Sequence, residues 1–194
     1  MNRRETFNRY ALHPWTDLPA LGEDESTPII VRGEGIYIYD EDGHRLIDGP
    51  GGMWCMQTGY GRKEIADAVS AQIMELGYST SFSTINPVEL ELAQRIARET
   101  PGDLNRVYFT TGGSTAVDSA LRLCQLASNI KGEPQRKHIL ARDKGYHGST
   151  YLSASITGKE RDKTLMDTLQ DNVHFLTAPC KYHHSQPGMD EEGF

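Results

Sequence analysis

The chain is poor in cysteine, lacks long apolar runs and has more acidic than basic residues. Its three cysteines are odd in number and widely spaced, which excludes a disulfide framework and is typical of a reducing compartment. No stretch is apolar over the length that spans a bilayer. Acidic residues outnumber basic ones by 27 to 20, and a net charge of −7 speaks against nucleic acid or anionic membrane as a partner. We therefore expect a cytoplasmic protein that binds neither.

Several common motifs are also absent. The glycines at 112 and 113 are not followed by the Gly-Lys-Ser/Thr of a Walker A loop, and no G-x-G-x-x-G dinucleotide fingerprint exists. No G-x-S-x-G elbow is present, so nothing supports a serine hydrolase. Cys180 and His183 have a ligand-like spacing, but a structural zinc site needs a second pair, so we predict no metal site.

The first 60 residues predict a small sheet. Residues 1–27 are expected to be irregular. Between 29 and 48, short apolar stretches separated by turn residues predict an antiparallel meander, with an Asp-Gly hairpin turn ending at Gly43. The glycines that then surround Trp54 predict unusual backbone angles, either in a tight bend or close to a ligand.

The pattern then changes to helices, and after residue 105 to alternating strands and helices. Amphipathic helices are predicted over 62–77 and, starting at Asn86 and Pro87, to about Glu99. Later strands are predicted at 106–110, 138–142 and 173–176, and later helices at 115–129 and 149–155. This alternation indicates a parallel sheet with helical crossovers, whose ligands lie at the carboxyl ends of the strands.

Two short motifs would follow such strand ends. At 111–115, Thr-Gly-Gly-Ser-Thr would direct backbone N–H groups and two hydroxyls toward one spot at the positive end of a helix, which suits a phosphate. The alternative is an ordinary strand-to-helix turn with a serine cap. Tyr146 and His147 lie between glycines and are either a plain surface turn or an aromatic wall near the same place. Together the two motifs suggest a flat, phosphorylated cofactor.

Taken in order, these pieces resemble the class III aminotransferases, pyridoxal-phosphate enzymes of fold type I, and especially their ω-aminotransferase branch. The resemblance covers almost the whole chain. The segments that carry it are 34–48, 52–55, 59–61, 113–122 and 141–150.

The resemblance implies an incomplete α/β fold. We expect an N-terminal segment with the meander over 1–60 and the first, truncated part of a mainly parallel, cofactor-binding domain over 61–194. It also implies a homodimer in the full-length enzyme, with 78–82 reaching the active site of a partner subunit.

The resemblance further assigns roles to single residues. Gly113 and Ser114 would hold the phosphate of pyridoxal 5′-phosphate, Tyr146 would lie against the pyridine ring, and His147 would shape that wall. Trp54 and Tyr146 would bind substrate.

Two departures from the family qualify these roles. The family usually has Asn-Ser-Gly-Ser-Glu where this chain has Thr-Gly-Gly-Ser-Thr at 111–115, so one hydroxyl is lost at Gly112 and an acidic side chain at Thr115. The family's Schiff-base lysine and the acidic partner of the pyridine nitrogen have no counterpart here, since the seven lysines match other positions. No catalytic residue is therefore assigned, and we expect the chain to be the N-terminal part of a longer enzyme.

The full enzyme is expected to move an amino group from an amine or ω-amino acid to a keto acid such as pyruvate. Two alternatives stay open. One is another enzyme on the same scaffold, an aminomutase or decarboxylase. The other is a truncated, non-catalytic chain that acts only as a binding or dimerisation segment.

Overall fold

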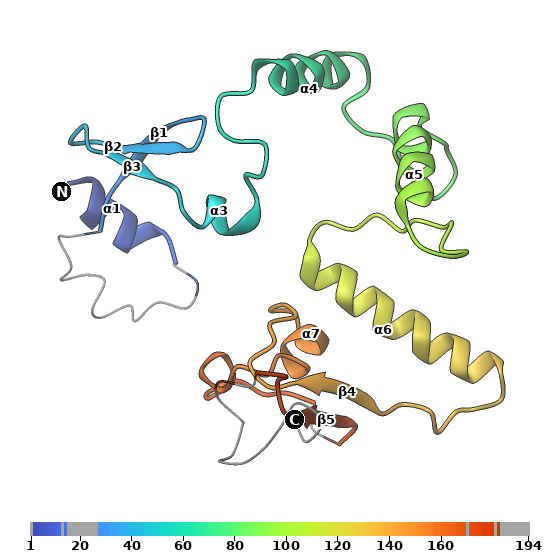
Figure 1. Cartoon of the computed structure of the whole chain (residues 1–194). Coiled ribbons are helices and arrows are strands. Elements are labelled where there is room, and N and C mark those ends of the chain that lie inside the picture. The colour runs from blue at the N-terminus through green and yellow to red at the C-terminus, as the bar shows by residue number, and fades with distance from the viewer. Residues whose placement is uncertain (1, 13, 15–26, 170, 181, 183–194) are drawn as a thin grey trace. The chain divides into compact units, whose positions relative to one another are not determined.

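The computed structural model describes residues 2–12, 14, 27–169, 171–180 and 182. Contacts group the chain into two compact units, Met1–Asn105 and Arg106–Phe194. Figure 1 labels the helices and strands of both. The division at residue 60 that the resemblance implies stays a prediction.

The first unit contains the predicted meander. Strands β1 (Ile30–Glu34), β2 (Tyr37–Asp40) and β3 (Arg45–Ile47) form a sheet in that order, with both pairs antiparallel. Gly43, in the turn between β2 and β3, has a φ of 88°, which suits glycine because it has no Cβ. The sheet and its hairpin turn are thus confirmed.

The N-terminal segment differs from the prediction of an irregular chain. Helix α1 (Arg3–Tyr10) begins with a capping box: the Asn2 side chain accepts the N–H of Glu5, and the Glu5 carboxylate accepts the N–H of Asn2, both at 2.8 Å. Each bond satisfies an N–H that has no partner within the helix. The Asn-x-x-Glu spacing was the sequence signal for this helix. Residues 13 and 15–26 lie outside the described part.

The glycine-rich segment after β3 forms one left-handed turn, labelled α3 (Gly51–Trp54). All four residues have positive φ, of 57°, 59°, 55° and 68° in order. A left-handed backbone costs a non-glycine residue roughly 1–2 kcal/mol, so Met53 and Trp54 are strained. The predicted unusual backbone is therefore confirmed.

Helices α4 (Lys63–Leu76) and α5 (Pro87–Glu99) match their predicted bounds within one residue. The Asn86 side chain caps α5 by accepting the N–H of Val88 at 2.9 Å. The apolar faces of both helices are exposed to solvent: Ile73 on α4, for example, is 60% exposed. Within the described residues, no helix is both long and apolar enough to cross a membrane.

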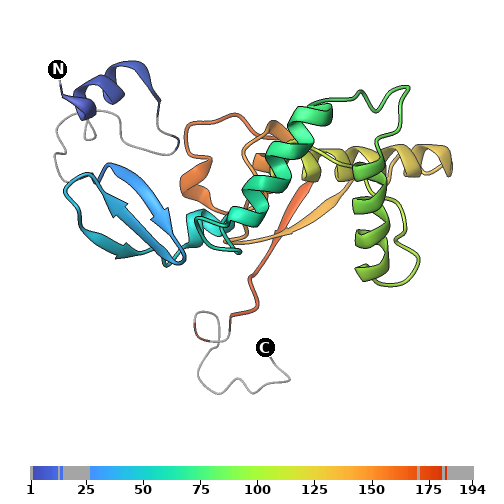
Figure 2. The ribbon, with the colours of Figure 1, turned by 90° about the horizontal axis from the view of Figure 1, so that it is seen from above.

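The second unit is a parallel strand pair with two helices. Its elements are α6 (Gly113–Ile130), β4 (Ile139–Arg142), α7 (Tyr151–Ser155), the short 3-10 turn η1 (Glu160–Asp162) and β5 (Val173–Leu176). Strands β4 and β5 run side by side in parallel, with Ile139 opposite Val173 (Figure 2). Parallel pairing agrees with the alternating pattern of the sequence.

The strand predicted over 106–110 is wrong for this structure. These residues are described and form no strand, since none of the described backbone pairs with them. The apolar residues that motivated the prediction are present, and Tyr108 is 73% exposed. A strand needs a neighbour that completes its backbone hydrogen bonds, and apolar sequence alone does not supply one.

The best-buried part of the second unit lies where α7 contacts α6. Ser153 is fully buried there, and Ser155, Ile156 and Thr157 are nearly so. Gly148, in the loop before α7, permits this packing. A Cβ on Gly148 would lie 2.4 Å from the Ser153 Oγ and 2.8 Å from the Ser114 Cα, closer than real Cβ atoms approach.

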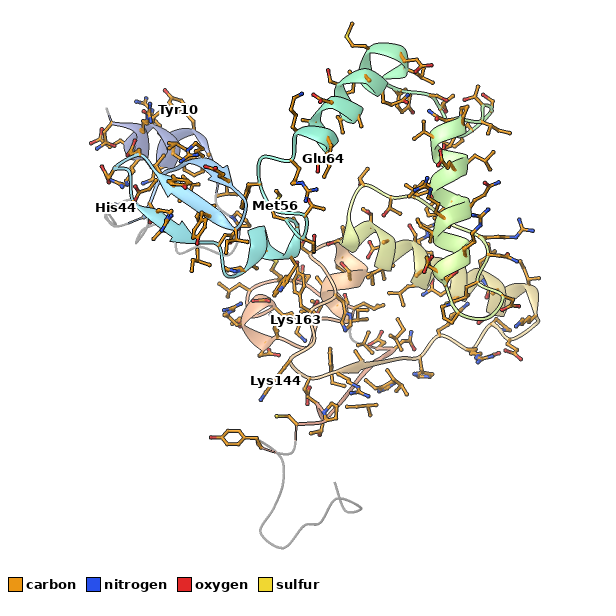
Figure 3. The ribbon with its side chains drawn as sticks, turned by 45° about the horizontal axis from the view of Figure 1, so that its top comes forward. Tyr10, His44, Met56, Glu64, Lys144 and Lys163 are labelled. Atoms are coloured by element: carbon orange, nitrogen blue, oxygen red, sulfur yellow. The ribbon has the colours of Figure 1, made fainter. Side chains whose placement is uncertain are left out.

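A carboxylate–imidazole pair makes the stability of the hairpin depend on pH. His44 Nδ1 lies 2.9 Å from the Asp40 Oδ2 (His44 is labelled in Figure 3). This hydrogen bond lowers the pKa of Asp40 below its ordinary 3.8 and raises the pKa of His44 above its ordinary 6.5. The stabilisation from Asp40 is lost as pH falls through its lowered pKa. The stabilisation from His44 is lost as pH rises through its raised pKa.

We therefore expect the hairpin to be most stable between pH 3.8 and 6.5. Urea unfolding of the wild type and of His44→Gln, measured from pH 3 to pH 9 in roughly unit steps, tests this. The difference in unfolding free energy between the two proteins should be greatest inside that window and shrink on both sides. A difference that does not vary with pH would contradict the prediction.

Gly148→Ala should destabilise the second unit by about 1–3 kcal/mol, because the added methyl group overpacks the contact with α6 at a positive φ. Thermal unfolding measures this loss. Gly112→Ala is the matched control: a Cβ there meets nothing within 4 Å, and the φ of 175° is open to any residue. Equal melting temperatures for the two variants would contradict the packing argument.

Candidate anion seat at the start of α6

The start of α6, residues 112–115, is an open helix N-terminus, which we call the anion seat. Gly112 is the N-cap with extended backbone, and α6 begins at Gly113. A Cβ on either glycine would meet nothing within 4 Å, so the space beside these two residues is open. The first backbone bond of this turn runs from the N–H of Ala116 to the Gly112 carbonyl at 3.0 Å. The N–H groups of Gly113, Ser114 and Thr115 thus have no partner inside the helix, and they form its positive end.

Ser114 is held in place by the loop before α7. Its Oγ accepts the backbone N–H of Ser149 at 3.0 Å, and its carbonyl accepts the Thr150 hydroxyl at 3.4 Å. An oxygen that accepts an N–H keeps its own proton to donate. The Ser114 hydroxyl is thus available as a donor beside the first-turn N–H groups.

The second predicted hydroxyl is used inside the turn. The Thr115 Oγ1 donates to the Gly112 carbonyl at 2.8 Å, and the Thr110 hydroxyl donates to the same oxygen at 3.1 Å. These bonds tie the threonines to the turn and away from the opening. Of the two hydroxyls at the start of the helix, that of Ser114 is thus the one directed away from the turn.

Tyr146 and His147 lie in the loop that also contacts Ser114. The Lys159 Nζ lies 5.4 Å from the centroid of the Tyr146 ring, a cation–π contact, and Tyr146 is 46% exposed. The His147 backbone N–H donates to the buried Thr157 hydroxyl at 3.1 Å. The structure thus places both residues in one loop with the neighbours of Ser114. Their roles toward a cofactor stay predictions.

Trp54 belongs to the first unit, and its role toward substrate also stays a prediction. Its left-handed turn is held by Asp48, whose Oδ2 accepts the Gly52 N–H at 2.8 Å and the Tyr60 hydroxyl at 2.6 Å. The hydrogen bond from the Tyr60 hydroxyl to Asp48 raises the pKa of Tyr60, and partial desolvation adds to the shift. Sequence reasoning missed Asp48 and Tyr60 as supports of Trp54. The indole itself is 71% exposed.

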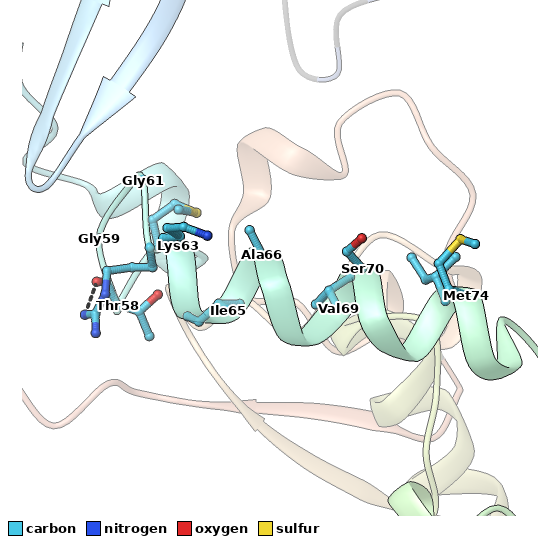
Figure 4. Close-up of a pocket in the computed structure, with 12 residues that line it drawn as sticks. Thr58, Gly59, Gly61, Lys63, Ile65, Ala66, Val69, Ser70 and Met74 are labelled. Carbon is cyan, nitrogen blue, oxygen red and sulfur yellow. Dashed lines mark hydrogen bonds between the residues drawn. The ribbon is translucent and has the colours of Figure 1, made fainter.

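An apolar groove runs along α4 in the first unit (Figure 4). Its volume is about 770 Å³, and Ile65, Val69 and Ile73 supply its apolar wall. At one end the Arg62 guanidinium donates to the Thr58 carbonyl at 3.2 Å. No predicted site residue lines this groove. The segment 78–82 follows α4, and its Phe82 is 99% exposed; its contact with a partner subunit stays a prediction.

One three-residue group in the described chain has metal-ligand atoms close together. Those of Asp40, Asp42 and His44 all lie within 4.8 Å of one another. The Asp40 Oδ1 already accepts the N–H groups of Asp42 and His44, and these bonds account for the closeness. We assign no metal to this cluster. His183 lies outside the described residues.

Comparison with known proteins identifies the family. A model of the family "Aminotransferase class-III" matches residues 20–193. The putrescine–pyruvate aminotransferase of Pseudomonas aeruginosa is 41% identical over 183 residues, which cover 94% of this chain and 38% of the relative. The omega-amino acid–pyruvate aminotransferase of Pseudomonas putida is 32% identical, covering 85% of this chain and 37% of the relative.

Solved structures agree. The omega transaminase from Pseudomonas jessenii in complex with PMP has a TM-score of 0.95 and 30% identity, covering 100% of this chain and 43% of that one. The chain thus spans about two fifths of the length of the relatives it matches. The predicted α/β fold is confirmed as part of a transaminase fold, and the chain belongs to the class-III aminotransferases, a pyridoxal-phosphate-dependent family.

Proposed function

We propose that this chain is the N-terminal part of a transaminase that moves an amino group from an amine or ω-amino acid to a keto acid such as pyruvate. The proposal rests on family membership and on the names of two pyruvate-using relatives. In this proposal the whole enzyme is a cytoplasmic homodimer, and 78–82 reaches the partner's active site. Three free cysteines in the described residues are consistent with a reducing compartment.

The start of α6 is the observation that carries the cofactor role. An open helix N-terminus with a donating Ser114 hydroxyl matches the charge and hydrogen-bonding needs of a phosphate dianion. In the proposal Gly113 and Ser114 bind that phosphate through backbone N–H groups and the hydroxyl. Gly112 and Gly113 have no Cβ, so the oxygens can approach the backbone closely.

The remaining residues would orient the cofactor and the substrate. Tyr146 offers an aromatic face to the pyridine ring, and His147 shapes the same wall. Trp54, held in its strained turn by Asp48, would line the substrate pocket and exclude water. When bound, the pyridoxal group serves as an electron sink during amino transfer.

A binding titration tests the seat. The chain should bind pyridoxal phosphate reversibly, and Ser114→Ala should weaken binding about 10-fold or more, because a hydrogen bond to a charged group is lost. Ser128→Ala is the matched control, since this exposed serine near the other end of α6 bonds only to its own helix, at the Cys124 carbonyl. Equal affinities for wild type and Ser114→Ala would contradict the assignment.

A chimera tests the reaction. The matched N-terminal part of the putrescine–pyruvate aminotransferase of P. aeruginosa is replaced by this chain. We expect the chimera to form alanine from pyruvate with putrescine or β-alanine as donor, because this chain has the family fold and would supply the same cofactor-binding residues. A chimera that folds and binds pyridoxal phosphate but makes no alanine with either donor would contradict the proposed activity.

A further inference from the structure

Asp118 on α6 reaches across to the loop that surrounds Ser114. It follows Ser114 by four residues, so the two lie on the same face of the helix, one turn apart. The Asp118 Oδ1 accepts the backbone N–H of Ser153 at 2.9 Å, although the two residues are 35 positions apart in sequence. Ser153 is fully buried. This carboxylate therefore ties the second turn of α6 to the start of α7.

Helix α7 has no cap of its own for this N–H group. The side chain of its N-cap, Thr150, makes no capping bond. Its hydroxyl is used elsewhere, 2.7 Å from the Ser153 Oγ and as a donor to the Ser114 carbonyl. The first N–H groups of a helix find no partner within it, and a buried one without a partner is costly. Asp118 supplies that partner from a neighbouring helix.

The same loop fixes the Ser114 hydroxyl. Ser149 donates its N–H to the Ser114 Oγ, and Gly148 lies too close to Ser114 to carry a side chain. Residues 148–153 are thus attached to α6 at three places: the Oγ of Ser114, the carbonyl of Ser114 and the carboxylate of Asp118. If the last attachment is lost, only Ser114 still holds the loop to α6, so the N–H that orients the Ser114 hydroxyl is held less firmly.

We propose that Asp118 is a positioning residue for the anion seat. It holds the start of α7 on α6, keeps the Ser149 N–H on the Ser114 Oγ, and so directs the Ser114 proton toward the opening of the helix. The part of this proposal that concerns phosphate rests on the proposed function. The part that concerns the loop does not, because it follows from the hydrogen bonds alone.

The test compares Asp118→Ala with Asp118→Asn, which keeps an oxygen acceptor of the same reach. Two quantities are measured: amide hydrogen exchange by NMR at Ser149 and Ser153, and affinity for pyridoxal phosphate. In Asp118→Ala we expect exchange at both amides to quicken about 10-fold or more and affinity to fall by about the same factor. Asp118→Asn should stay near wild type in both. Glu133→Ala, which removes only a surface ion pair with Arg136, is the control.

The outcomes separate the two proposals. Unchanged exchange at Ser149 in Asp118→Ala overturns the positioning role, whatever the affinity. A wild type that binds no pyridoxal phosphate overturns the phosphate role of the start of α6 in this chain, and the exchange measurement still decides whether Asp118 holds the loop. If Asp118→Ala also loses protection in β4 and β5, the comparison moves to Asp118→Leu, which fills a similar volume but has no acceptor. Wild-type exchange at Ser149 and Ser153 in that variant overturns the proposal.

Discussion

The close approach of Gly148 to Ser114 is the constraint on which the second unit depends. A Cβ at Gly148 would lie 2.6 Å from the Ser114 Oγ, so the loop reaches α6 only because this residue has no side chain. That approach brings the Ser149 N–H to the Ser114 Oγ and Thr150 to the Ser114 carbonyl. The anion seat is therefore a property of two segments together. A helix N-terminus alone would leave the serine free to rotate or to cap its own helix.

Helices α4 and α5 of the first unit show the opposite situation, because their apolar faces are exposed in the described part of the chain. Helix α4 has a regular apolar stripe, yet Val69 in the middle of that stripe is 52% exposed. Amphipathic helices in proteins gain most of their stability from tertiary packing. The P. jessenii structure holds this fold within 43% of its chain, so most of that protein lies outside the matched region. Under the proposed function, the rest of the enzyme would stabilise two features of this chain: the exposed apolar faces by burial, and the segment 106–110 by backbone hydrogen bonds.

Local sequence signals predicted the elements well, and they failed where a partner decides the structure. Asn86 and Pro87 marked the start of α5, and Gly43 marked the hairpin, because caps and turns depend on a few neighbouring residues. The strand at 106–110 depends on a second strand, and no pattern within the segment reports one. Helix α1 was not predicted, although its Asn2–Glu5 capping box is a local signal of the same kind as those at Asn86 and Gly43.

The candidate site divides in the same way. The glycine pair and Ser114 were predicted from sequence, because a helix N-terminus that binds an anion needs small residues and a hydroxyl close together, and their role stays a prediction. Asp118 and Asp48 were not predicted from sequence as supporting residues. Each acts on a backbone N–H or hydroxyl that folding alone brings near: Asp118 on an amide 35 positions away, and Asp48 on Tyr60, 12 positions away. Supporting residues of this kind have no fixed spacing, so a single sequence does not reveal them.

Lys159 shows how the local structure limits what a lysine near the site can do. Its ammonium lies over the Tyr146 ring, and a cation–π contact requires the charged form. This contact holds Lys159 beside the Tyr146 ring, so we assign it to supporting that ring rather than to a covalent step. Under the proposed function, Ser114 and Tyr146 would bind and orient the anionic, aromatic cofactor. The covalent step in the proposed function needs a lysine in a different environment.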